Sequence, residues 1–404
     1  MNKHYYYELM LKELEKQDGN NKKRLLLHVC CAVCSSWVIL YLSQYFDVTL
    51  FFNNSNIYPR REFEKRLSEL ERYIQESGQE VEVVVAEYNS GYQKDFFDYK
   101  DLKEGQQRCE LCIARRMEEA YLYAQQQNFA YFTTVMSVSR NKDAIMINEI
   151  GAELQKKYTP KYLYGDFKKN EGIVKTNAVV SEYAIYRQNY CGCVYSLRRP
   201  DNTTLDFLPG RNIFLAQRKD MFRLNTDTAL LGEYLKVEKN ETVLDAGCGN
   251  GVLLLYAAQF DYRELIGIDV LASAIELADY NLKINGIENY SLVNDSIENF
   301  TRKVDVIVCN PPYFSYEGNP FVNDNGYLKT ARHFTDNSLV SFGAAFARIL
   351  KPSGRLYLVY RYDLWQDVER LFNEAGLFVS DKSVVTENRT VGNHIILATL
   401  KFST

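Results

Sequence analysis

Residues 242–251 read TVLDAGCGNG, a short apolar run that ends in an aspartate and passes into a loop with three glycines. The run is predicted to be a strand, and residues 252–260 after the loop are predicted to be a helix. A glycine-rich loop between a strand and a helix lets backbone N–H groups approach a ligand at the positive end of the helix. The stretch therefore predicts an α/β fold with a binding site at the carboxyl end of this strand.

The second half of the chain continues this alternation. Further strands are predicted at residues 265–270, 290–294, 304–309 and 355–360, and candidates at 379–386 and 394–402 close the chain. Helical segments lie between the first five strands, so a doubly wound sheet ending in a hairpin is expected. This layout resembles a class I S-adenosylmethionine-dependent methyltransferase.

Acidic residues end three of these predicted strands, and this is the pattern that such a cofactor requires. Gly247, Gly249 and Gly251 let backbone amides approach its methionine part, beside Asp245. Asp269 can accept bonds from the ribose hydroxyls, as in dinucleotide folds, and Asp295 from the adenine amino group.

Asn310-Pro311-Pro312-Tyr313 follows the fourth strand and predicts the methyl acceptor. The two prolines fix the backbone, so that a carbonyl and the Asn310 side-chain oxygen can both accept hydrogen bonds from one planar amino group. Tyr313 can stack on an extruded base. Adenine in DNA, adenine in RNA and glutamine amides in proteins all carry such an amino group.

The first half has its own alternation of strands and helices. Strands are predicted at residues 24–29, 48–52, 81–86 and 130–134, and helices at 61–77 and 112–127. This order predicts a mostly parallel sheet, with chemistry at the carboxyl ends of its strands. A polar, turn-rich stretch follows Tyr195. Because 404 residues exceed the usual size of one core, we expect domains at 1–199 and 200–404.

Seven of the nine cysteines fall into three tight groups before residue 200. Cys30, Cys31, Cys109 and Cys112 are spaced to hold an iron–sulfur cluster, although zinc also accepts four thiolates. Cys191-Gly-Cys193 is interpreted as a reversible, easily reduced disulfide, or else as two more metal ligands.

The motifs of this half resemble the epoxyqueuosine reductase QueH family. They are His28-x-Cys-Cys-x-x-Cys34, Asn56-Ile-Tyr-Pro59, Arg108-Cys-x-x-Cys112, Thr133-Thr-x-x-Ser-Val-Ser139, Asn148-Glu-Ile-Gly151, Asp166-Phe-Lys-Lys169 and Tyr186-Arg-Gln-x-Tyr-Cys-Gly-Cys-x-Tyr-Ser196. The resemblance implies reduction of epoxyqueuosine at the tRNA wobble position. It also implies a [4Fe-4S] cluster on Cys30, Cys31, Cys109 and Cys112, and a redox-active Cys191/Cys193 pair. Cys34 is predicted to be either a ligand to a second iron or a supporting thiol.

The second half resembles the valine-tRNA adenine-37 N6-methyltransferases. Residues 222–231, the Asn-Pro-Pro-Tyr-Phe314 form and Ala331-Arg-His333 carry this resemblance. It implies that Thr226 and Asp227 belong to the cofactor pocket and that Arg332 and His333 lie on a substrate-side loop. A non-catalytic tRNA-binding module and a methyltransferase for a protein glutamine are the alternatives.

Composition limits the partners. The net charge of −4 argues against wholesale wrapping by nucleic acid, so tRNA needs local basic patches. The candidates are Arg198, Arg199, Arg211, Arg218, Lys219 and Arg223, and a lysine group between residues 156 and 169. No apolar run has membrane-spanning length, and a cytoplasmic protein is expected. An external electron donor is also expected for the reductase.

Overall fold

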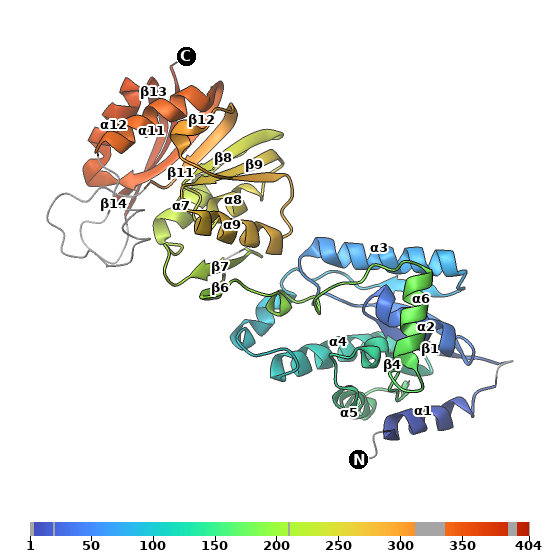
Figure 1. The fold of residues 1–404 in the computed structure, drawn as a ribbon. Coiled ribbons are helices and arrows are strands. Elements are labelled where there is room, and N and C mark those ends of the chain that lie inside the picture. The colour runs from blue at the N-terminus through green and yellow to red at the C-terminus, as the bar shows by residue number, and fades with distance from the viewer. Residues whose placement is uncertain (1–3, 19–20, 209–210, 312–335, 387–393, 404) are drawn as a thin grey trace. The chain divides into compact units, whose positions relative to one another are not determined.

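In the computed structural model of the protein, the apolar run Lys23–Val29 forms β1 at the centre of a five-stranded parallel sheet. The strand order is β3-β2-β1-β4-β5, and Figure 1 labels β1 and its neighbour β4. Its other strands are β2 (Phe46–Phe52), β3 (Glu82–Val85), β4 (Tyr131–Thr134) and β5 (Lys161–Tyr162). The first and fourth strands are neighbours, so the direction of winding reverses between them. This switch point is where an open α/β sheet places its ligand.

The structure describes residues 4–18, 21–208, 211–311, 336–386 and 394–403. Within them the chain divides into two units, Met1–Leu197 and Arg198–Thr404. Each unit has its own sheet, and the two are described separately below. None of the helices in these ranges is long and apolar enough to cross a membrane.

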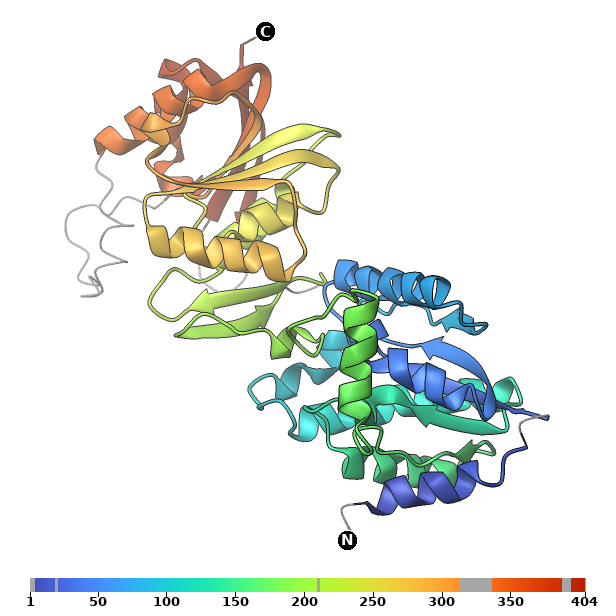
Figure 2. The ribbon, with the colours of Figure 1, turned by 45° about the vertical axis from the view of Figure 1, so that its right-hand side comes forward.

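Helices cover both faces of the first sheet (Figure 2). Alternate side chains of β1 point to opposite faces, so Leu25 and Leu27 enter one apolar core and Leu26 enters another. The helices of this unit are α1 (Tyr5–Leu14), α2 (Ala32–Leu42), α3 (Arg60–Ser77), α4 (Gln107–Gln126), α5 (Ala144–Gln155) and α6 (Gly172–Glu182), with 3₁₀ turns η1 (Tyr92–Tyr99), η2 (Val135–Val138) and η3 (Val194–Ser196). The helix predicted at 112–127 begins earlier, at Gln107, so Cys109 lies in its first turn.

The second sheet has seven strands in the order β10-β9-β8-β11-β12-β14-β13. Its strands are β8 (Glu241–Ala246), β9 (Tyr262–Asp269), β10 (Tyr290–Asn294), β11 (Val304–Cys309), β12 (Leu350–Arg361), β13 (Leu377–Thr386) and β14 (His394–Phe402). The first five are parallel, and β13 and β14 form the expected antiparallel hairpin. The predicted fold class, two α/β units of which the second is a doubly wound methyltransferase sheet, is confirmed.

Helices also cover both faces of this sheet. They are α7 (Thr226–Tyr234), α8 (Val252–Ala257), α9 (Ala272–Ile284), α11 (Asp336–Ile349) and α12 (Trp365–Glu374), with short 3₁₀ turns η4 (Ile297–Asn299) and η5 (Tyr362–Leu364). Leu244 packs into one core and its neighbour Val243 into the other, as a strand buried on both faces requires. Here again the first and fourth strands, β8 and β11, are neighbours.

A small hairpin precedes this sheet and was not predicted. Its strands, β6 (Thr203–Phe207) and β7 (Phe214–Arg218), form a separate antiparallel pair. The hairpin attaches to α9 through Asn281, which accepts from the Ala216 N–H at 2.8 Å and donates to the Ala216 carbonyl at 2.9 Å. Strand pairing and the buried Asn281 amide stabilise this hairpin. From its sequence, the polar, turn-rich stretch before it indicated only a domain boundary.

Candidate functional site

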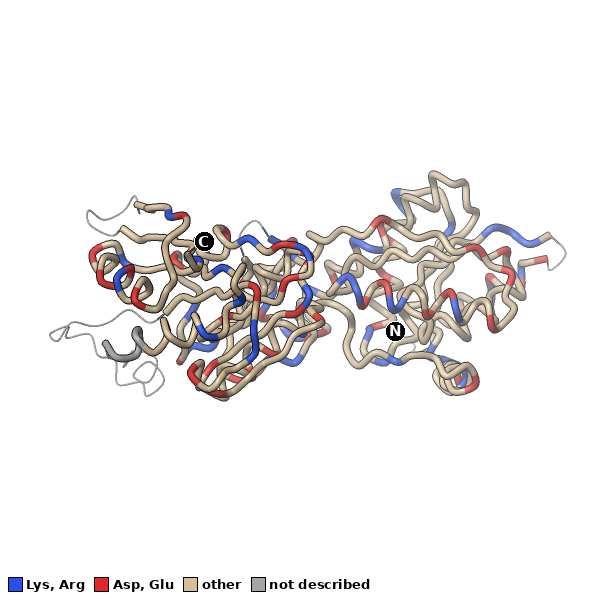
Figure 3. The backbone as a smooth tube through the Cα atoms, turned by 90° about the horizontal axis from the view of Figure 1, so that it is seen from above, with Lys and Arg blue, Asp and Glu red and all other residues tan. Residues whose placement is uncertain are grey.

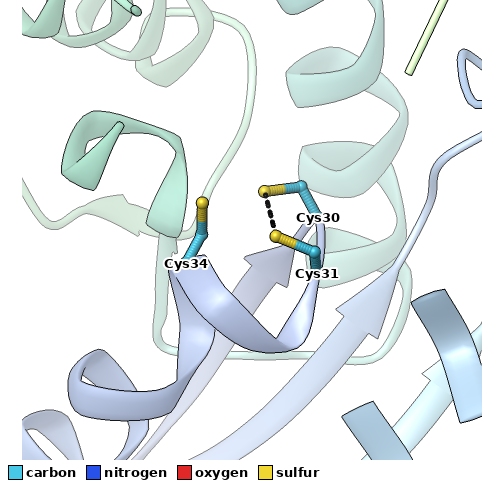
Figure 4. Close-up of side chains that lie close together, drawn as sticks. All are labelled: Cys30, Cys31 and Cys34. Atoms are coloured by element: carbon cyan, nitrogen blue, oxygen red, sulfur yellow. Dashed lines mark hydrogen bonds between the residues drawn. The ribbon is translucent and has the colours of Figure 1, made fainter. Parts of the chain in front are cut away.

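Three thiols meet where β1 ends. Cys30 and Cys31 follow the strand directly, and Cys34 lies in the first turn of α2. Their sulfur atoms all lie within 4.8 Å of one another, and those of Cys30 and Cys31 are 3.9 Å apart (Figure 4). The side chains converge because a strand end and the helix turn after it bring positions i, i+1 and i+4 together. This group could hold a metal ion.

The three thiols differ in acidity. Hydrogen bonding from the Cys31 and Cys34 thiols holds the pKa of Cys30 well below its usual range. The bond to Cys30 raises the pKa of Cys31 to about 11, and the same kind of bond raises the pKa of Cys34. One thiolate with two neighbouring thiols therefore forms first. A thiolate is the form that binds metal.

A cavity of about 320 Å³ opens in the same unit and carries four more thiols. Cys109 and Cys112 reach it from the first turns of α4, and Cys191 and Cys193 from the segment before η3. Its other lining residues include Asn56, Tyr92, Gln93, Arg108, Arg116, Lys142 and Tyr195. The Asn56 Oδ1 atom is buried and has no hydrogen-bond partner among the described residues. An unpaired acceptor on a cavity wall suits a ligand that offers a hydroxyl or amino hydrogen.

Two cations link the thiol groups. The thiolate charges of Cys191 and Cys30 outweigh burial and raise the pKa of Lys142. The Lys142 charge also acts on the thiols of Cys112 and Cys34. Arg116 is only 2% exposed, and it donates to the neutral partners Asn53 O and Asn54 Oδ1. Positive charge is thus concentrated where thiolates would form, and it stabilises them.

The segment that carries Cys191 and Cys193 is anchored to α3. Arg66 donates to the carbonyl oxygens of Cys191 at 3.0 Å and Tyr190 at 3.3 Å. Between the cysteines, Gly192 has φ +129°, and a Cβ there would lie 3.1 Å from the Ile57 side chain. This backbone conformation is one that only glycine adopts readily.

Cys109 and Cys112 line the cavity and are not part of the close-packed three-thiol group. The group whose sulfurs lie within 4.8 Å comprises Cys30, Cys31 and Cys34, within the described part of the chain. Cys109 Sγ instead accepts from the Gly105 N–H at 3.2 Å, and the Tyr92 hydroxyl approaches Cys112 Sγ at 3.6 Å.

Two polar residues of the family motifs, His28 and Lys168, have structural partners. Burial and the Arg116 charge lower the pKa of His28 to about 3, and its Nδ1 lies 3.0 Å from Thr134 Oγ1. His28 is therefore a neutral, buried partner of the neighbouring strand. Lys168 donates from Nζ to the Lys142 carbonyl at 2.9 Å, and so supports the loop that presents Lys142.

In the second unit the glycine loop follows β8. Gly251 has φ +77°, and a Cβ there would lie 3.1 Å from Ala278 in α9, so a larger residue would disturb helix packing. Asp245 is 1% exposed, and neither of its carboxylate oxygens has a hydrogen-bond partner among the described residues. Burial and the Asp269 charge raise its pKa well above the usual range. An orphaned carboxylate beside a glycine loop fits a cationic cofactor such as S-adenosylmethionine.

Asp269 connects the end of β9 to this loop. Its carboxylate accepts from the N–H groups of Gly249 at 2.9 Å and Leu271 at 3.0 Å. Because a carboxylate has several acceptor positions, these bonds leave it able to accept ribose hydroxyls as well. Asp295 is exposed after β10, and bonds from the Asn299 side chain and the Ser296 N–H lower its pKa.

Asn310 and Pro311 follow β11, beside the glycine loop of the neighbouring β8. Asn310 Nδ2 lies 2.7 Å from Thr228 Oγ1 in α7, whose first residues are Thr226 and Asp227. The predicted residues Pro312, Tyr313, Phe314, Ala331, Arg332 and His333 lie outside the described residues.

The predicted basic patch around the β6–β7 hairpin is partly neutralised. Arg211 pairs with Glu233 at 2.6 Å, Arg218 with Asp220 at 2.6 Å and Arg223 with Asp206 at 2.9 Å. Acidic and basic residues are interspersed along the backbone of both units (Figure 3). Three of the six candidate residues are therefore committed to carboxylates, which weakens the patch as a phosphate-binding surface.

Comparison with known proteins distinguishes the two units. Residues 25–199 match the family model "Epoxyqueuosine reductase QueH", and residues 212–381 match "Methyltransferase small domain". The epoxyqueuosine reductase QueH of Streptococcus pyogenes serotype M1 is 35% identical over 199 residues, 48% of this chain and 78% of that protein. The QueH of Staphylococcus epidermidis is 35% identical over 200 residues, 47% of this chain and 84% of that protein.

A solved structure also resembles the chain. The ribosomal protein L11 methylase from Lactobacillus delbrueckii subsp. bulgaricus superposes with a TM-score of 0.35 and 19% identity, over 46% of this chain and 84% of that one.

The parallel sheet with a thiol-lined cavity defines an oxidoreductase domain, and the doubly wound sheet with its glycine loop defines a methyltransferase domain. Both activities belong to one polypeptide. Within this class the chain belongs to the epoxyqueuosine reductase QueH family, and it carries a small methyltransferase domain in addition.

Reasoning from the sequence missed two residues of these sites. Lys142 belongs to none of the motifs recognised in the sequence. Its role is apparent only in the folded structure, where it lies near thiols from three separate segments. Thr228 lay directly after the predicted Thr226 and Asp227, but its bond to Asn310 spans 82 positions of the chain. The spacing of Cys30, Cys31 and Cys34 could have revealed their convergence, because those positions are local.

Proposed function

We propose that the protein is a bifunctional tRNA-modifying enzyme that acts on the anticodon loop. The first unit reduces epoxyqueuosine to queuosine at position 34, and the second transfers a methyl group from S-adenosylmethionine to the exocyclic amino group of an adenine, at position 37. Both positions lie in the anticodon loop, so one bound tRNA offers both substrates. We place both activities in the cytoplasm. The cavity that gathers four thiols and Lys142, in a chain of the QueH family, carries the proposal.

The reduction needs two electrons and two protons, because the epoxide C–O bonds break to give an alkene and water. The thiols of Cys191 and Cys193 release two electrons and two protons when they form a disulfide, so they balance this reaction. An external electron donor then restores the dithiol. Burial, then the Cys191 charge, raises the pKa of Cys193 to about 12, so this thiol keeps its proton at neutral pH.

The cysteines of this unit also suit an iron–sulfur cluster, which requires several converging thiolates. We assign Cys30, Cys31, Cys109 and Cys112 as its ligands, with Cys34 as a ligand to a second iron or a supporting thiol. Convergence of Cys30 and Cys31 with Cys34, and the action of Lys142 on both Cys30 and Cys112, support this assignment. When bound, the cluster would supply single electrons and a Lewis-acid site.

In the second unit, Asp245, Asp269, Asp295 and the loop glycines Gly247, Gly249 and Gly251 are proposed to bind S-adenosylmethionine, with Thr226 and Asp227. Asn310 and a neighbouring backbone carbonyl accept hydrogen bonds from the target amino group. These bonds orient its nitrogen toward the methyl group. Pro311 and Pro312 fix the backbone, and Tyr313 stacks on the base.

Mass spectrometry of tRNA nucleosides from a deletion strain tests both halves. Accumulated epoxyqueuosine together with reduced N6-methyladenosine is expected, and each defect should persist separately when the strain carries the Cys191→Ser or the Asn310→Ala variant. Unchanged queuosine would contradict the reductase half. Methyl transfer to a release factor alone would move the acceptor to a protein glutamine, and transfer to neither would make the second unit a tRNA-binding module.

A further inference from the structure

Asn310 is held by two residues that precede it by more than eighty positions. Its Nδ2 lies 2.7 Å from Thr228 Oγ1. Thr228 Oγ1 in turn lies 2.7 Å from Asn225 Oδ1, which also lies 2.9 Å from the Thr228 N–H. Asn225 is the N-cap of α7, so this chain of bonds begins at a helix terminus.

The direction of each bond follows from what each group can do. A backbone N–H is only a donor, so the Asn225 atom that meets it is the carbonyl oxygen. That oxygen is only an acceptor, so the Thr228 hydroxyl must donate its single proton to it. The hydroxyl oxygen can then only accept from Asn310. The group of Asn310 that faces Thr228 is therefore its NH₂.

We infer that Thr228 is a positioning residue that selects one orientation of the Asn310 amide and so presents Oδ1 to the methyl acceptor. Among the described residues no donor reaches this Oδ1. An oxygen in that place accepts an N–H from the substrate, whereas the flipped amide would present its own N–H groups and repel an amino donor. The inference rests on the proposed function and narrows the acceptor to a group that carries N–H hydrogens, such as an exocyclic amine or a carboxamide.

The same geometry explains why α7 begins where it does. The cap oxygen of Asn225 accepts both the helix N–H and the hydroxyl, so one side chain starts the helix and fixes the direction of the chain of bonds. Because α7 packs on α8, which follows the glycine loop, the helix places Thr228 at the carboxyl end of β11. Thr228 thus connects the start of α7 to the group that recognises the acceptor.

Steady-state methylation of tRNA by the full-length protein tests this role with Thr228→Val and Thr228→Ser. Valine matches threonine in shape and keeps the backbone N–H bonded to Asn225, but it removes the hydroxyl. We expect kcat to fall by about 10- to 100-fold for valine and by less than about threefold for serine, with the Kd of S-adenosylmethionine unchanged. The Kd of S-adenosylmethionine for the same preparations controls for folding of the second unit, which carries Thr228.

A valine variant with kcat within about twofold of the wild type would overturn the inference. So would equal losses of kcat and S-adenosylmethionine affinity in both variants, because that pattern indicates a structural role. If the wild-type product is methylglutamine, the adenine assignment fails. The loss of kcat is then still expected to be larger for Thr228→Val than for Thr228→Ser. A product methylated on a ring nitrogen without hydrogens would contradict both the adenine amino-group assignment and the inferred role of Thr228.

Binding provides a readout that does not depend on turnover. With S-adenosylhomocysteine bound, the wild type should bind an anticodon stem-loop that carries adenosine at position 37 more tightly than one that carries purine riboside, which lacks the amino group. Thr228→Val should reduce this preference, and Thr228→Ser should keep it. Equal affinities of the wild type for both stem-loops would contradict the assigned orientation.

Discussion

The side-chain amide of Gln188 donates from Nε2 to the Cys31 sulfur across 3.0 Å, and thereby joins two segments 157 positions apart. Gln188 precedes Cys191 and Cys193, so the segment that carries the proposed redox pair also contacts the three-thiol group. An N–H donor beside a ligand sulfur stabilises its thiolate form and orients it.

Replacing Gln188 by leucine should weaken iron binding by about 10- to 100-fold, the usual effect of removing a partner of a metal ligand. Iron retention during chelator competition measures this change after anaerobic reconstitution. Gln44→Leu is the matched control, because Gln44 is exposed and its amide donates to the Leu40 carbonyl in the last turn of α2. Equal retention by both variants would show that the Gln188 bond does not support the metal site.

Lys142→Met should slow alkylation of the metal-free protein by about tenfold at pH 7. The Lys142 cation stabilises the neighbouring thiolates, and its removal raises the pKa of Cys30, so less reactive thiolate remains. Iodoacetamide labelling mapped by mass spectrometry gives the rate at each cysteine. Lys156→Met changes an exposed lysine paired with Glu153 and should leave the rates unchanged. Unaltered labelling in Lys142→Met would refute the electrostatic role.

Labelling of the wild type against pH should follow the order of acidity in the three-thiol group. The low pKa of Cys30 places its ionisation below that of an ordinary cysteine, whereas Cys31 should ionise near pH 11. One site should therefore label at neutral pH, and the second should appear only in strong alkali. Simultaneous labelling of Cys30 and Cys31 would contradict this order.

Gly192→Ala should lower the epoxyqueuosine reductase rate by at least about tenfold while the cluster content is kept. The backbone at φ +129° disfavours alanine, and the added Cβ would meet Ile57 and Arg66, so Cys191 and Cys193 must shift. Gly78→Ala is the control. It has φ +64° at the end of α3 with open space around it, and it should cost only about 1 kcal/mol of stability. A wild-type epoxyqueuosine reductase rate in Gly192→Ala would show that the reaction does not require this loop geometry.

Asp245→Asn should stabilise the ligand-free second unit by about 1–3 kcal/mol, because it removes a buried carboxylate without partners. It should also weaken S-adenosylmethionine binding. The folded-state pKa is raised, so the wild type loses stability as the pH rises above the ordinary aspartate value of 3.8 and through the raised pKa. The variant should lack this loss. Thermal unfolding against pH, with and without cofactor, measures both effects, and a less stable variant would contradict the orphaned-charge argument.

Much of the architecture could be predicted because strand and helix periodicities are local. The strands at Tyr290–Asn294, Val304–Cys309 and His394–Phe402 have the predicted bounds. The β6–β7 hairpin could not be predicted, since its stability comes from Asn281 in a helix much later in the chain. A pair of strands of five residues each carries little periodicity of its own.

Local motifs were enough to predict the chemistry of each half, from clustered thiols in one and from a glycine loop with acids at strand ends in the other. Motifs of this kind are local, because a turn or a strand end needs particular residues at fixed spacing. Long-range packing of the folded chain brings particular groups together, such as Cys112 with Lys142 and Asn310 with Thr228. Those pairs depend on the order of parallel strands, which places distant segments at one switch point through long-range packing that no local spacing encodes.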